Sequence, residues 1–150
     1  MARSVTAERL AALRTRVNAC FEAGALATGA QLTIEELGNA FSHMVNDDDI
    51  LGHYRVAAES LGRAFTLDDD GIAPPTISTD MANVSLVVPS IHPLLGIPTG
   101  GAVNHQPTFT RACVTAEADE AVIEGAVALA LTGVSVAGDA PLRARLLARP

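Results

Sequence analysis

The segment between residues 78 and 105 constrains the fold most, because its prolines and glycines are too closely spaced for a long helix to pass through. These breaks are Pro89, Pro93, Gly96, Pro98, Gly100 and Gly101. From Ile91 to Ile97 apolar residues alternate along the chain, which predicts one short strand at a sheet edge, where proline is tolerated. The segment therefore separates helical patterns before it from those after it.

Helical spacing dominates the first part of the chain. Apolar residues from Leu10 to Phe21 recur at steps of three and four, which predicts a helix over about residues 6–28 that Gly29 ends. Residues 31–35 then alternate between polar and apolar, as in a strand with one buried face. The pattern predicts a helix followed by a strand.

A second helix is predicted after the acidic run Asp47 to Asp49, because carboxylates cap free N–H groups and face the positive end of the helix dipole. Gly62 closes this helix. The acidic and proline-rich residues 68–75 then break the chain. We place the boundary between two domains there, with residues 1–66 before it and 67–150 after it.

Two further helices are predicted near the end of the chain. Thr115 precedes an acidic first turn and caps the first of them, and Asp139 starts the second with Pro141 in its first turn. With the two short strands, these helices predict a mixed α/β protein.

Composition excludes several classes of protein. Hydrophobic content of 49% argues against disorder, and a net charge of -7 disfavours binding to nucleic acid. Cys20 and Cys113 form no CxxC motif, so we expect reduced thiols in a cytoplasmic protein. The most apolar stretch, Ala121 to Ala137, contains Glu124, and we predict that it does not span a membrane.

Two separated motifs carry a resemblance to a known family. Residues 78–85 read STDMANVS and are followed by VVPSIHP at residues 87–93, and residues 104–109 read NHQPTF. These resemble the STDMGNVS, VP.IHP and H.P.F elements of the aminoacylase-like metal-dependent amidohydrolases and peptidases, which include aminobenzoyl-glutamate hydrolases and related dipeptidases. Residues 19–29 are similar to a helix of that family's inserted lid domain.

The resemblance implies an α/β fold made of two parts. Residues 67–150 would be the C-terminal segment of a zinc-peptidase-like α/β/α catalytic domain, and residues 1–66 would be part of an α+β ferredoxin-like lid used for dimerisation. Ala82 stands where the family usually has glycine. If that backbone needs a positive φ angle, Ala82 is strained or the loop differs.

The resemblance also implies the site residues. His105 matches the last metal ligand, and the other ligands and the general base would precede residue 1. A single histidine cannot hold a catalytic ion, so a divalent metal, zinc in this family, is expected only in a complete enzyme. The predicted substrate-binding residues are Ser78, Thr79, Asp80 and Asn83. The first three either receive a substrate carboxylate at a helix N-terminus or simply cap that helix.

Our leading hypothesis is a C-terminal fragment of a hydrolase that cleaves amide bonds in N-acyl amino acids or dipeptides. Because this chain lacks most metal ligands and the general base, we expect it to be inactive alone and to need a complementary N-terminal chain. We also expect a homo-oligomer and no nucleic acid or membrane partner. The alternative is a non-catalytic dimerisation or binding module derived from the same family.

Overall fold

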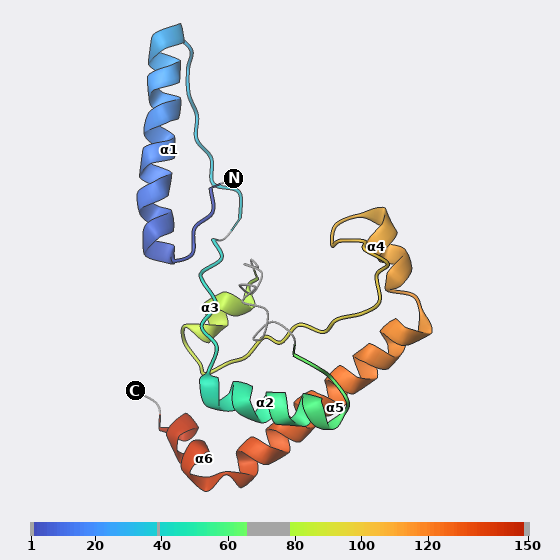
Figure 1. Ribbon diagram of the computed structural model, residues 1–150. Helices are drawn as coiled ribbons and strands as arrows, with labels where there is room; N and C mark the ends of the chain where they lie inside the picture. Colours follow the sequence, from blue (N-terminus) through green and yellow to red (C-terminus); the bar gives the residue numbers. More distant parts are fainter. Residues whose placement is uncertain (1, 39, 66–78, 149–150) are drawn as a thin grey trace. The chain divides into compact units, whose positions relative to one another are not determined.

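The computed structural model describes residues 2–38, 40–65 and 79–148, and every regular element within them is a helix (Figure 1). The helices are α1 (Ala7–Thr28), α2 (Asp48–Ser60), α3 (Met81–Ser85), α4 (Pro107–Ala112), α5 (Ala116–Gly138) and α6 (Ala140–Leu147). The helix starts predicted at Asp47, Thr115 and Asp139 are confirmed. The side chains of Thr6, Asp47, Thr115 and Asp139 each accept a backbone N–H three residues on.

The predicted α/β fold with a ferredoxin-like lid is wrong for the residues that the structure describes. Residues 31–35 and 91–97, both predicted as strands, lie in irregular chain. Alternation of side chains fits any half-buried segment, whereas a strand also needs a neighbouring segment to accept its backbone hydrogen bonds. No such partner lies beside either segment within the described ranges.

The chain folds into two compact units, each made of segments that are separated in the sequence. The described parts of Met1–Val45 and Pro74–Val88 form the first unit, and those of Asn46–Ala73 and Pro89–Pro150 form the second. This grouping does not test the predicted lid and catalytic roles of residues 1–66 and 67–150. The boundary predicted between them lies outside the described residues, so that division stays a prediction.

The first unit contains a long helix with no buried residue. Gly29 ends α1 with φ 69°, as predicted. The chain after it runs back beside the helix (Figure 1), where Arg14 forms an ion pair with Glu36 and the Ala7 N–H donates to His43 Nδ1 at 3.4 Å. Polar contacts rather than an apolar core therefore hold α1.

Helix α3 is the better buried element of the first unit. Ala82 is only 1% exposed, lies in helical backbone and has no positive φ angle, so no strain arises at this position. Ser85 is also buried, and its hydroxyl accepts the Val45 N–H at 3.0 Å and donates to the Ala82 carbonyl at 2.8 Å.

The core of the second unit lies between α2 and α5. Tyr54 and Ala58 on α2 pack with Ala128 on α5. The Tyr54 ring meets the Phe65 ring edge to face, with centroids 6.5 Å apart. Ala57, Ala118 and Ala121 add further small buried side chains, so this core is built from alanine around a single tyrosine.

The irregular chain before α4 also packs on α5. A Cβ atom at Gly125 would lie 2.3 Å from Cδ1 of Leu95, so the glycine lets this leucine approach the helix backbone. Arg63 fixes the same region, because it donates to the Gly96 carbonyl at 2.9 Å and pairs with Glu124 at 2.5 Å. Ile91 also packs against the core of the second unit, so Ile91 and Leu95, two of the alternating apolar residues, contact the helices without forming a sheet.

Helix α5 is apolar on more than the face it buries. Its most apolar 18-residue window has a mean hydropathy of 1.8, and 22% of that window is buried. By length and composition alone, such a helix can cross a membrane, and a core helix of a soluble protein meets the same description. The expectation that no part of this chain enters a membrane stays a prediction.

Candidate functional site

Three of the four predicted substrate-binding residues lie at α3 in the first unit, and Ser78 lies outside the described residues. The Thr79 hydroxyl accepts the Met81 N–H at 3.3 Å. Asp80 is exposed, and its side chain makes no cap hydrogen bond to the helix. Because α3 has only five residues, its aligned peptide dipoles are few and attract an anion weakly.

Asn83 joins α3 to the chain that precedes α2. Its Oδ1 accepts the Ser42 N–H at 2.7 Å, and its Nδ2 donates to the Ala40 carbonyl at 3.3 Å. The side-chain oxygen and nitrogen of Asn83 are therefore both hydrogen-bonded to backbone groups of this segment, as the backbone of a neighbouring strand would be. This arrangement supports a structural role for Asn83, and its predicted contact with substrate stays untested.

His105 lies in the second unit, on the exposed turn that leads into α4. Its φ angle is 66°, and it is the one non-glycine residue with a positive φ angle among the described residues. Gly100 and Gly101, shortly before it, also have positive φ angles of 59° and 86°. A histidine in this conformation costs about 1 kcal/mol relative to ordinary backbone, which makes the position unusual.

The residues that the structure describes do not form a metal centre by themselves. No group of three or more His, Cys, Asp or Glu side chains is placed to share an ion within those ranges. A catalytic zinc ion needs about three protein ligands and an open position for water. His105 can supply one of them, and the described residues do not supply the rest.

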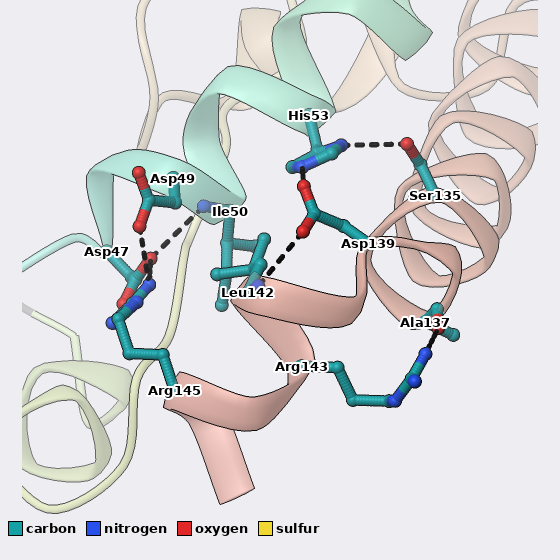
Figure 2. Close-up of polar contacts among 10 residues, drawn as sticks. All are labelled: Asp47, Asp49, Ile50, His53, Ser135, Ala137, Asp139, Leu142, Arg143 and Arg145. Carbon is teal, nitrogen blue, oxygen red and sulfur yellow. Dashed lines mark hydrogen bonds and ion pairs between the residues drawn. The ribbon is translucent and has the colours of Figure 1, made fainter. Parts of the chain in front are cut away.

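The most connected polar cluster is one that sequence reasoning did not assign, and we call it the α2–α6 junction (Figure 2). Asp139 accepts the Leu142 N–H at 2.9 Å through Oδ1, and its Oδ2 lies 3.6 Å from His53 Nε2. The other ring nitrogen of His53, Nδ1, lies 2.7 Å from Ser135 Oγ. The His53 side chain is 25% exposed.

Arg145 completes the α2–α6 junction from the other side. Its guanidinium lies 2.7 Å from Asp47 Oδ1 and 2.9 Å from Asp49 Oδ2, and Asp47 also caps α2 through the Ile50 N–H (Figure 2). The hydrogen bond from Arg145 lowers the pKa of Asp47, although partial burial of this carboxyl opposes the shift. One arginine therefore ties α6 to the start of α2.

Ser135, His53 and Asp139 have the residue types of a serine hydrolase triad, but their surroundings do not suit that chemistry. One oxygen of Asp139 is committed to the N-terminus of α6, and the other lies too far from His53 for a strong hydrogen bond. Ser135 lies within α5, whose own hydrogen bonds use the backbone N–H groups that an oxyanion hole would need. We conclude that the cluster fastens α2, α5 and α6 together.

A shallow cavity of about 510 Å³ opens beside this junction. Its lining combines charged and apolar side chains and comprises Asp49, Gly52, His53, Val56, Asp139, Pro141, Leu142 and Arg145. Most of these charged groups already pair with one another, so the cavity offers little unpaired charge to a ligand.

Comparison with known proteins relates this chain to dipeptidases. It is 34% identical over 134 residues to a mouse protein named Xaa-Arg dipeptidase, a stretch that covers 89% of this chain and 31% of the mouse protein. The human protein of the same name is 32% identical over 134 residues, covering 89% of this chain and 30% of that protein. No family model matches the chain.

These similarities confirm the predicted relationship to peptidases at its coarser level. The chain is related to dipeptidases, at modest identity. It spans about 30% of the length of the curated relatives it matches. The comparison therefore shows a relationship to dipeptidases and does not show dipeptidase activity for this chain.

Proposed function

We propose that this chain forms part of a metal-dependent hydrolase that cleaves dipeptides or N-acyl amino acids, and that His105 is one of its metal ligands. The relationship to proteins named Xaa-Arg dipeptidase carries the proposal. The name of these relatives suggests a dipeptide with arginine in its second position as the first substrate to try.

The backbone around His105 supports the role given to it. The His105 side chain is exposed, its φ angle is positive although it is not a glycine, and Pro107 fixes the start of α4 just after it. Unfavourable backbone conformations of this kind are concentrated at functional sites, where they hold a side chain in a required direction. An exposed imidazole on such a turn has a ring nitrogen available for a metal ion.

The count of donors supports the second part of the proposal, that this chain does not catalyse alone. A bound divalent ion would lower the pKa of its water so that hydroxide can attack the peptide carbonyl. The described residues offer one candidate ligand, and a catalytic ion needs several. We therefore assign no step of hydrolysis to this chain by itself and propose that other polypeptide supplies the remaining ligands and the general base.

A non-catalytic role in association is the second candidate, favoured by the surface of the first unit. Apolar side chains there are widely exposed, with Phe21 at 58%, Leu26 at 86% and Leu37 at 94%. Such surface suits a binding or dimerisation module. We keep a homo-oligomer and a reducing, cytoplasmic setting as proposals, the latter supported by the free thiols Cys20 and Cys113.

A chimera tests the role of His105. The 134-residue stretch of the mouse dipeptidase that matches this chain is replaced with the corresponding residues of this chain, and hydrolysis of alanyl-arginine and bound zinc are measured. We expect the chimera to hydrolyse the dipeptide and His105→Ala to lower the rate by roughly 100-fold or more, with less zinc bound. His92→Ala, at another exposed histidine of the second unit, is the matched control.

The isolated chain provides the second arm of the test. We expect it to bind less than one zinc ion per chain and to hydrolyse no alanyl-arginine. Full dipeptidase activity of this chain alone would contradict the requirement for other polypeptide. Full activity and full zinc in the His105→Ala chimera would remove His105 from the site.

A further inference from the structure

Helix α5 has its small residues inside and its large residues outside. The stripe buried within the second unit consists of Ala118, Ala121, Gly125, Ala128 and Thr132. The opposite face carries branched aliphatic side chains at helical spacing, which we call the outer stripe: Ile123, Val127, Leu131 and Val134. Their exposed fractions are 65%, 40%, 42% and 72%. A helix that is apolar on all sides is buried either inside a larger protein or in a membrane.

The outer stripe is long and uncharged. From Ile123 to Val134 it extends for roughly 16 Å along the helix axis. Glu124 is the one ionisable side chain between Ala121 and Gly138, and it is held by Arg63 at 2.5 Å. A surface of this kind matches an aliphatic partner surface and has no charge with which to recognise a polar one.

A lipid bilayer is a poor partner for the outer stripe. Helix α2 packs along the inner face of α5, so any environment that surrounded α5 would also surround α2. With 13 residues, α2 is too short to span a bilayer, and it carries Arg55 and Glu59, which pair at 3.1 Å on its surface. Moving these charges into hydrocarbon is costly.

We propose that the outer stripe of α5 is the docking surface for the polypeptide that corresponds to the part of the dipeptidase relatives without a counterpart here. This inference rests on the proposed function. The stretch matched by this chain makes up 31% of the mouse relative, so most of that protein is available to cover it. Docking there brings the additional polypeptide to the same unit that carries His105.

Cysteine labelling in the chimera described above tests this docking. Val134→Cys places a thiol on the outer stripe, in a background with Cys20→Ser and Cys113→Ser because both native thiols are exposed. Glu59→Cys, at a side chain that is 49% exposed on α2, is the control. The rate of alkylation at each position is read by mass spectrometry of the corresponding peptide, in the isolated full chain and in the chimera.

We expect the thiol at position 134 to react about tenfold more slowly in the chimera than in the isolated chain, while the thiol at position 59 changes by less than about twofold. Equal rates at position 134 in both proteins would overturn the proposal. A chimera that does not fold also counts against it, because the two surfaces are then not complementary.

Two other outcomes name a different occupant and likewise overturn the proposal. Protection of position 134 in the isolated chain that disappears on dilution identifies a second copy. Protection that appears only on adding phosphatidylcholine vesicles identifies a bilayer. Hydrolysis of alanyl-arginine by the same chimera separates the two ideas, because activity with an open position 134 refutes only the docking, and protection without activity refutes only the proposed function.

Discussion

The two units of this chain contain long, well-capped helices, yet they differ in what holds those helices. In the second unit, α2 and α5 bury Tyr54 at 2% exposure and Ala128 at 2% exposure between them. In the first unit, α1 buries no residue over its 22 positions, and it makes polar contacts with sequence-distant residues, from Arg14 to Glu36 and from the Ala7 N–H to His43. A good cap starts a helix, but most of its stability in a protein comes from an apolar face that packs.

The largest expected effect separates the two units directly. Tyr54→Ala removes the central side chain of the second unit and should lower the free energy of unfolding by about 3 kcal/mol. Phe21→Ala, at a side chain of α1 that is 58% exposed, should lower it by less than about 1 kcal/mol. Urea unfolding followed by far-ultraviolet circular dichroism measures both, and equal losses would erase the difference drawn between the units.

A second substitution sharpens the contrast within α5 itself. Ala128→Leu adds a large side chain to the closely packed inner stripe and should destabilise the second unit by about 2 kcal/mol. Ala130→Leu adds the same atoms on an exposed position two residues away and should change stability by less than about 0.5 kcal/mol. The same urea titration compares them, and the assignment of inner and outer faces fails if Ala130→Leu proves the more damaging.

The features that sequence predicted correctly are those that depend on near neighbours along the chain. The sequence places Asp47, Thr115 and Asp139 at helix starts, and each side chain accepts the backbone N–H of a residue only three positions on, so the signal and its partner are close in the sequence. The predicted strands failed because a strand needs a distant partner that no local pattern specifies. The relationship to dipeptidases was found because its motifs are also local.

The site features that sequence missed all join distant residues. Asn83 binds backbone at residues 40 and 42, and His53 meets Ser135 and Asp139 more than 80 positions away. A lone asparagine or histidine gives no sign of which distant segment it will meet. At α5 the sequence signal is too broad rather than missing. Both faces of the helix are apolar, and helical spacing alone does not say which face packs.

The first unit offers a prediction of its own. Asn83→Ala removes hydrogen bonds to the Ser42 N–H and the Ala40 carbonyl and should cost about 1 kcal/mol, because both bonds are exposed to water. Hydrogen exchange should speed up at Ser42 and stay unchanged in α2 and α5. Asn104→Ala, at an exposed asparagine of the second unit, is the control. Faster exchange throughout α5 would mean that the units do not unfold separately.

The smallest effect concerns the α2–α6 junction and its dependence on pH. Arg145 lowers the pKa of Asp47 in the folded chain, so the stability from this pair is fully present above the unfolded pKa of about 3.9 and is lost as the pH falls through the folded value. Arg145→Ala should therefore lower the stability at pH 7 slightly and change it little at pH 2. Arg143→Ala removes a neighbouring arginine that contacts the Ala137 carbonyl, and the stability difference it causes should not follow the titration of Asp47 (Figure 2). Urea midpoints between pH 2 and pH 7 decide the matter, because an Arg145→Ala deficit that does not shrink with acid would show that packing of the arginine, and not its charge, joins the two helices.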